Sequence, residues 1–129
     1  KGKIMENIFL EATKYTPEIS LDAATGIISL KGKSYPENTF DFYEPVVGWL
    51  KSFFTEPKSG AKIVFDISYF NSSSSRLFFD IFDILEEAVE NGSTLSIEWM
   101  YDAENDSAKE AGEDFKDDFD TLEFELVEK

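Results

Sequence analysis

The chain has no cysteine and no histidine among its 129 residues. It therefore has no disulfide, no zinc site built on these residues, no cysteine nucleophile and no histidine-based triad, which excludes most familiar enzyme chemistry. The sequence also lacks an apolar run long enough to cross a bilayer, and a basic-then-apolar leader that ends in small residues. We expect a non-enzymatic protein without cofactors that is soluble and cytoplasmic.

Basic side chains are scarce in the second part of the chain. Residues 77–129 hold three Lys or Arg against eighteen Asp or Glu, whereas residues 1–76 hold nine of each, so the net charge of −15 falls after residue 76. A strongly acidic surface repels nucleic acid and anionic lipid and favours encounter with a basic protein surface. The alternative is that these carboxylates only keep the protein soluble.

Apolar side chains are plentiful enough for one hydrophobic core. The chain is 42% hydrophobic and 16% aromatic and includes 13 Phe, at a length that is ordinary for a single domain. We therefore predict one domain over residues 1–129. Met5 is a candidate for the natural start, so residues 1–4 do not enter the fold prediction.

Apolar periodicity predicts five strands and three helices. The strands are Glu18–Asp22, Gly26–Lys31, Ala61–Tyr69, Thr94–Tyr101 and Leu122–Val127. The helices are Phe40–Phe54, Leu77–Val89 and Ser107–Phe119. In the first helix, Phe40 belongs to a broad apolar face that we expect to be buried. Pro45 leaves two alternatives, a start near Glu44 or a helix capped by Asn38 and kinked at Pro45.

The order of these elements predicts an α/β fold. Its features are a small mixed β-sheet, an N-terminal hairpin that turns at Gly26, two right-handed β-α-β crossovers, and helices packed on the sheet. The continuous apolar run Ala61–Tyr69 predicts a central strand buried on both faces. The last strand, Leu122–Val127, is expected at an edge.

Four consecutive serines, Ser72 to Ser75, separate a predicted strand from a predicted helix. Loops at the carboxyl ends of parallel strands are favoured places for sites, and a helix start can be capped by a hydroxyl or can hold a phosphate. Ser73 or Ser74 is the better candidate for the cap, which leaves Ser72 without a structural duty. Plain capping and regulated phosphorylation both remain open on the residues alone.

Four acidic residues match part of the spacing of the ligands in a calcium-binding loop. Asp102, Glu104, Asp106 and Glu113 occupy its first, third, fifth and twelfth positions, but Ser107 stands where the loop needs glycine. We expect no metal site there.

Four stretches together resemble the SiaC family of bacterial regulatory phosphoproteins. They are Ser34-Tyr35-Pro36-Glu37-Asn38, Asn71-Ser72-Ser73-Ser74, Asp80-Ile81-Phe82-Asp83-Ile84-Leu85-Glu86-Glu87-Ala88, and Trp99-Met100-Tyr101-Asp102 followed by Asn105. They occur in the family's order, and the resemblance runs from about Thr16 to Phe119.

This resemblance implies a STAS-like fold and a role as a partner switch. In the family, a Ser/Thr protein kinase of the histidine-kinase-like ATPase type phosphorylates the hydroxyl residue after the Asn, and a PP2C-like phosphatase removes the phosphate. The unmodified form binds and activates a diguanylate cyclase, which raises cyclic di-GMP and favours biofilm. Carried over, the phosphoacceptor is Ser72, beside Asn71, with Ser73 and Ser74 as alternates. The best-known family pattern has Thr where this chain has Ser72.

The residues expected to contact partners lie in the two stretches that precede helices. They are Tyr35, Pro36, Glu37, Asn38, Asn71, Ser73 and Arg76. A structural turn also explains the first stretch, because Pro36 favours an extended residue before it and Asn38 can start a helix. Arg76 either pairs with the phosphate or anchors the first helical turn.

Three other functions compete with this hypothesis. An anti-sigma-factor antagonist would bind a switch kinase in place of a cyclase. A small enzyme would use Ser72 as its nucleophile, but no base beside it is evident to activate it. An acidic scaffold domain would bind partners without any phosphate.

Overall fold

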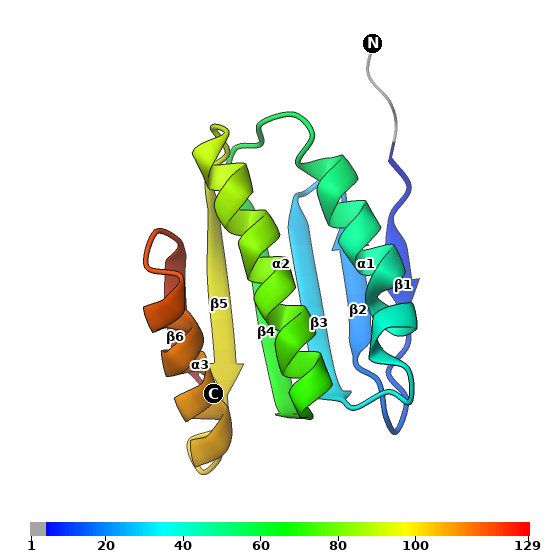
Figure 1. Cartoon of the computed structure of the whole chain (residues 1–129), viewed down its shortest axis with the longest axis vertical. Helices are drawn as coiled ribbons and strands as arrows, with labels where there is room; N and C mark the ends of the chain where they lie inside the picture. Colours follow the sequence, from blue (N-terminus) through cyan, green and yellow to red (C-terminus); the bar gives the residue numbers. More distant parts are fainter. Residues whose placement is uncertain (1–4) are drawn as a thin grey trace.

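The computed structural model describes residues 5–129, and the prediction about residues 1–4 lies outside this range. These residues form one six-stranded sheet and three helices (Figure 1). No helix among the described residues is long and apolar enough to cross a membrane. The elements are β1 (Ile8–Leu10), β2 (Glu18–Asp22), β3 (Ile27–Ser34), α1 (Thr39–Phe53), β4 (Ala61–Phe70), α2 (Ser72–Glu90), β5 (Leu95–Tyr101), α3 (Asp106–Asp118) and β6 (Glu123–Glu128).

The sheet is mixed, and its strands lie side by side in chain order from β1 to β6. The first three strands pair antiparallel, and β3, β4, β5 and β6 pair parallel. The predicted hairpin is confirmed, with Gly26 at a φ of 72° in its turn, a conformation that suits glycine. The two predicted crossovers through α1 and α2 are confirmed, a third runs through α3, and β6 lies at the edge as expected.

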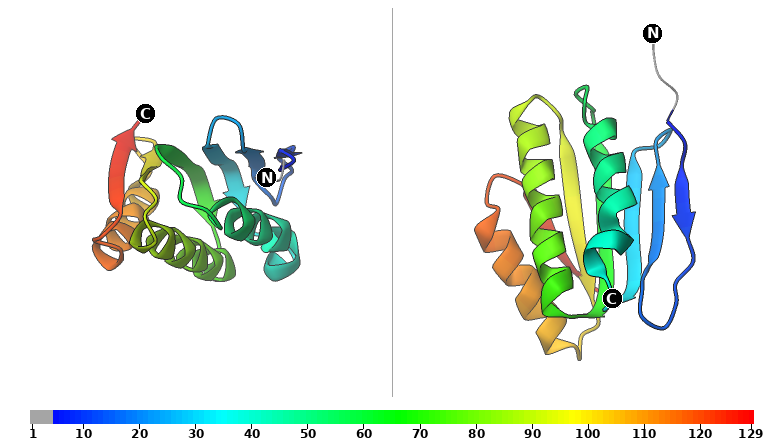
Figure 2. Two further views of the ribbon diagram at one scale, coloured as in Figure 1. Left: turned by 90° about the horizontal axis from the view of Figure 1, so that it is seen from above. Right: turned by 45° about the vertical axis from the view of Figure 1, so that its right-hand side comes forward.

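All three helices cover the same face of the sheet (Figure 2). The prediction that the strand from Ala61 is buried on both faces was therefore wrong. Ile63, Phe65 and Ile67 point into the core, whereas Lys62 and Ser68 are exposed on the opposite face. Successive residues of a strand point to opposite faces of the sheet. Polar residues at every second position of an apolar run therefore indicate a strand that is buried on one face only.

Aromatic rings fill the core between the sheet and the helices. Trp99 of β5 is fully buried and stacks on Phe65 of β4 at a centroid distance of 5.5 Å. Its indole Nε1–H donates to the backbone oxygen of Ala108 in α3, 2.9 Å away. Gly112, one turn further along α3, faces the same ring and leaves it room. These contacts fix α3 against the sheet.

The structure moves the start of the second helix and confirms Asn38 as the cap of the first, one of the two alternatives predicted for it. The second helix begins at Ser72, five residues before the predicted Leu77, because Asn71 caps it and the serines form its first turn. The first helix begins at Thr39 after an Asn38 cap and contains Pro45, so the alternative of a start near Glu44 was wrong. The three-residue strand β1 was not predicted, because so short a run carries no clear period.

Candidate functional site

The stretches predicted to contact partners meet at the carboxyl edge of the sheet. The last residues of β3 and β4, Ser34 and Phe70, are register partners. The backbone N–H of Asn71 then donates to the carbonyl oxygen of Ser34 at 3.1 Å. Because β3 and β4 are parallel, the starts of α1 and α2 both lie at this edge (Figure 1).

Asn71 is the cap of α2, which corrects the prediction that Ser73 or Ser74 caps it. Its side-chain oxygen accepts from the backbone N–H of Ser74 at 2.9 Å. Asn38 and Asn105 cap α1 and α3 in the same way, each accepting from the N–H three residues on. An Asn at this position satisfies one of the unpaired N–H groups that begin every helix. The serines are thus free of capping duty.

Ser74 belongs to a buried chain of hydrogen bonds. Its hydroxyl donates to the carbonyl oxygen of Ser34 at 2.9 Å, and it contacts the Ser34 hydroxyl at 2.7 Å. The Ser34 hydroxyl also contacts the Tyr43 hydroxyl at 2.6 Å. Each hydroxyl has one proton, so Tyr43 donates to Ser34, and Ser34 donates to Ser74. Burial raises the pKa of the Tyr43 hydroxyl far above its usual value, which keeps it a neutral donor.

This network makes Ser74 a poor phosphoacceptor. Its side chain is fully buried, and both its proton and a lone pair are engaged with Ser34. A kinase could reach it only if the start of α2 came away from the sheet. The structure therefore disfavours this alternate on physical grounds.

Removing the Ser74 hydroxyl should destabilise the fold much more than removing that of Ser72. Ser74→Ala leaves the proton of the Ser34 hydroxyl without its buried acceptor and removes one of the two donors to the Ser34 carbonyl oxygen. We therefore expect a loss of about 1–2 kcal/mol in the free energy of unfolding. Ser72→Ala is the matched control, and its loss should stay within about 0.5 kcal/mol. Urea unfolding of both variants measures this difference, and equal losses would contradict the assigned network.

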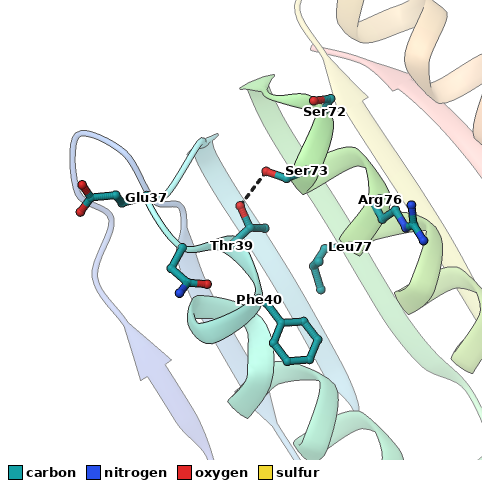
Figure 3. A pocket seen from close by; sticks show the side chains of 8 residues that line it. Glu37, Thr39, Phe40, Ser72, Ser73, Arg76 and Leu77 are labelled. Carbon is teal, nitrogen blue, oxygen red and sulfur yellow. Dashed lines mark hydrogen bonds between the residues drawn. The ribbon is translucent and has the colours of Figure 1, made fainter.

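Ser72 and Ser73 are exposed, but their hydroxyls differ in how they are held. Ser73 donates to the side-chain oxygen of Asn71 at 3.2 Å and lies 2.8 Å from the Thr39 hydroxyl, which links the starts of α1 and α2 (Figure 3). No hydrogen bond within residues 5–129 engages the Ser72 hydroxyl. Of the three candidate serines, Ser72 is the one that combines exposure with a free hydroxyl.

A shallow hollow of about 580 Å³ lies beside Ser72 and Ser73, between the starts of α1 and α2. Arg76, one turn further along α2, brings a positive charge to it, and no ion pair in the described part of the chain neutralises this group. The residues around the hollow are Glu37, Asn38, Thr39, Phe40, Ser72, Ser73, Arg76 and Leu77 (Figure 3). The helix start and Arg76 together suit a phosphate on Ser72.

The stretch from Tyr35 to Asn38 divides into structural and exposed members. Pro36 is buried and Asn38 is the cap of α1, while Glu37 is exposed at the hollow. Tyr35 lies between Tyr15 and Tyr69, with ring centroids 5.3 and 5.5 Å away. Glu37 and this tyrosine cluster remain candidates for partner contact, whereas Pro36 serves the fold.

Sequence reasoning missed two residues that the structure places at the site. Phe40, expected in the core, is 69% exposed at the hollow, and Thr39 bonds to Ser73. Phe40 lies to one side of the buried stripe of α1, which includes Thr39 and Tyr43, and the apolar period alone does not separate these two sides of the helix. The acidic spacing from Asp102 gains no support, since residues 5–129 contain no group of three or more acidic side chains able to hold a metal ion.

The comparisons with known proteins show the family to which the chain belongs. The model of the SiaC family of regulatory phosphoproteins matches residues 10–129. This chain belongs to the SiaC family. An uncharacterized protein of Pseudomonas aeruginosa strain UCBPP-PA14 is 33% identical over 114 residues, which are 88% of this chain and 90% of that protein. The predicted resemblance to the SiaC family is thereby confirmed.

Solved structures of SiaC from Pseudomonas aeruginosa show the same fold. One is 31% identical with a TM-score of 0.83, and the match covers 95% of this chain and 97% of that one. Another shows SiaC as the activator of the diguanylate cyclase SiaD, in complex with it; it is 31% identical with a TM-score of 0.84, over 94% of this chain and 97% of that SiaC. The family thus includes a member that binds a cyclase.

Proposed function

We propose that this chain is a non-enzymatic, cytoplasmic partner switch that binds and activates a diguanylate cyclase while Ser72 is unmodified. Phosphorylation of Ser72 releases the cyclase. The main observation behind the proposal is that the side chain of Ser72, at the start of α2, is exposed and that its hydroxyl makes no hydrogen bond within residues 5–129. Membership of a regulatory phosphoprotein family and the complex of SiaC with SiaD support it.

The proposed switch acts at the surface and leaves the fold intact. A phosphate adds about −1.5 to −2 charges and three strong acceptors. On Ser72 these would lie at the positive end of the α2 dipole and near Arg76, so the folded state tolerates them. A partner that covers Ser72 would have to dehydrate the phosphate, which costs free energy only in the complex. The phosphate therefore weakens binding without unfolding the chain.

The resemblance to the family implies the two opposing enzymes of this switch. A Ser/Thr protein kinase of the histidine-kinase-like ATPase type would add the phosphate, and a PP2C-like phosphatase would remove it. Both need the hydroxyl outside the core, as Ser72 is and Ser74 is not. The exposed side chain of Ser73 is the remaining alternate, but its hydroxyl would first have to leave Asn71 and Thr39.

Site-resolved mass spectrometry of the protein recovered from its own cells tests the phosphoacceptor. We expect phosphate on Ser72 in a fraction of the molecules and none on Ser74, because the latter is buried and doubly bonded. Peptides that cover residues 70–76 completely, from several growth conditions, are needed. Phosphate on another residue alone, or on none under any condition, would contradict the proposal.

A further inference from the structure

The strand that leads to Ser72 has an irregular end. The ladder between β4 and β5 stops at Phe65, and residues 66–70 of β4 pair with β3 alone among the described strands. In this last part the register against β3 shifts after Gly32, and Ser68 is left without a partner in the ladder. Ser68 is therefore the extra residue of a β-bulge, a feature that bends a strand and is common next to functional sites.

The bulge changes which side chains of β4 face the helices. Before it, Ile67 is fully buried under the helices. After it, Phe70 packs on Phe78 of α2 with ring centroids 5.3 Å apart, whereas Tyr69 is 53% exposed. In a regular strand the faces alternate, so without the extra residue Tyr69 would face the core and Phe70 would face water. The bulge thus sets the direction in which the chain enters α2.

Asn105 binds the bulged residue. Its side-chain Nδ2–H donates to the carbonyl oxygen of Ser68 at 2.9 Å, while its side-chain oxygen accepts from the N–H of Ala108 as the cap of α3. The start of α3 lies at the same carboxyl edge of the sheet as the start of α2 (Figure 1). One half-buried amide therefore joins the start of α3 to the end of β4, beyond the point where β5 pairs with it.

An ion pair makes a second link to this part of β4. The ammonium of Lys129 lies 2.8 Å from the carboxylate of Asp66, and this hydrogen bond raises the pKa of Lys129. Salt weakens an ion pair between partly exposed side chains, which contributes little to stability. Asp66 also precedes the bulge, so this pair does not fix Ser68. The hydrogen bond from Asn105 is the contact that reaches the bulge itself.

We propose that Asn105 is a positioning residue of the switch, which fixes the bulge at Ser68 and through it the place of Ser72 at the edge of the sheet. This inference rests on the proposed function. Asn105 does not line the hollow beside Ser72, so it acts through the backbone of residues 68–71. When its bond to Ser68 is absent, the turn into α2 samples other positions. A partner that fits one position of Ser72 then binds a smaller fraction of the molecules.

Asn105→Asp separates the two roles of this side chain. Aspartate caps a helix as well as asparagine does, but it has no N–H to donate to Ser68. The backbone amide of Asn71, which donates to Ser34, reports opening of the β4 end. We expect its hydrogen exchange, measured by NMR, to become about fivefold faster, the effect of one hydrogen bond of ordinary net strength. Exchange at Phe65 and the midpoint of thermal unfolding should stay nearly unchanged.

Two control variants separate the lost bond from the added charge. Asn105→Ser also caps α3 and adds no charge, but its hydroxyl is too short to reach Ser68, so it should speed exchange as the aspartate variant does. Ser107→Asp adds a charge to the exposed first turn of α3 and keeps Asn105, so its exchange should match the parent. Parental exchange in both Asn105 variants, or equally fast exchange in Ser107→Asp, would overturn the proposal.

Cyclase binding shows whether this positioning serves the switch. Asn105→Ser should bind a purified diguanylate cyclase from the same genome about three- to fivefold more weakly by titration calorimetry, and Ser107→Asp should bind as the parent does. If Asn105 acts through Ser72, its effect should fall below about twofold when Ser72→Glu is already present, because both changes then act on one contact. Unchanged binding, or equal losses in both backgrounds, would exclude the positioning role.

The outcomes distinguish this inference from the proposed function. The exchange measurements need no partner, so parental exchange in Asn105→Ser refutes the inference whatever the cyclase does. That result leaves the effect of Ser72→Glu untouched. If Ser72→Glu binds the cyclase as tightly as the parent while Asn105→Ser exchanges faster, Asn105 holds the bulge and the phosphate switch is wrong.

Discussion

Ser72→Glu should bind a diguanylate cyclase about 30-fold more weakly than the parent chain, which corresponds to about 2 kcal/mol. The carboxylate stands at the exposed first residue of α2, where the parent offers a small neutral hydroxyl. Burying it under a partner costs the free energy of its dehydration, and a charged group truncated or added at such a contact changes affinity by this order. The fold should be unaffected, since a negative charge at a helix start is favourable.

Two further substitutions of Ser72 separate the effect of charge from that of size. Ser72→Gln has nearly the shape of the glutamate variant without its charge, and Ser72→Ala removes the hydroxyl. Both should bind within a few-fold of the parent in the same calorimetric titration. If the glutamine variant binds as weakly as the glutamate variant, the size of the side chain and not its charge causes the loss of affinity. If the glutamate variant binds like the alanine variant, Ser72 is not a charge-sensitive contact.

Gly112→Ala and Gly48→Ala should change stability in opposite directions, although both replace a helical glycine by the best helix former. A Cβ at Gly112 would lie 2.5 Å from Cδ1 of Trp99, whose indole is fully buried and bonded to Ala108. The ring cannot retreat, so overpacking should outweigh the gain in helix propensity by about 2 kcal/mol. A Cβ added at Gly48 would have no atom within 4 Å outside the backbone of its own helix. Only the gain in helix propensity, about 0.5–1 kcal/mol, therefore remains.

Urea unfolding of the two glycine variants measures this difference, which should total about 3 kcal/mol. Near-ultraviolet circular dichroism of Gly112→Ala should also change, because the asymmetric packing around Trp99 is disturbed. Equal stabilisation of both variants would show that α3 lies further from β5 than the structure has it. This would leave the account of the Ser72 site unaffected.

The strands and helices could be predicted because apolar residues recur with a different spacing in strands and in helices. The alternation in β5 and the three-to-four spacing in α2 give their type and approximate bounds. The start of α2 could not be placed, since serines have weak helix propensity and Leu77 is the first apolar residue of the run. Yet Ser74 lies four residues before Phe78 and so on the buried stripe. That signal becomes visible only once the helix is extended back to its Asn71 cap.

The candidate site was predictable in most of its residues, Thr39 and Phe40 excepted, but not in their roles. Asn71 and Ser72 are recognisable by their resemblance to the family motif, although its best-known pattern has Thr in place of Ser72. The bond from Ser74 to Ser34 joins residues 40 positions apart, and no local pattern encodes so distant a pair. The hollow beside Ser72 likewise depends on the starts of two helices from separate crossovers lying together. The side chains that decide which serine is free were therefore accessible only through the tertiary structure.

Cyclase activation by the chain before and after phosphorylation tests the central claim most directly. Purified chain carrying phosphate on Ser72 alone, unmodified chain, and chain treated with phosphatase should each be added to the cyclase while cyclic di-GMP synthesis is followed. We expect activation by the unmodified chain, little activation by the phosphorylated chain, and recovery of activation after phosphatase treatment. Equal activation by the phosphorylated and unmodified chains would contradict it.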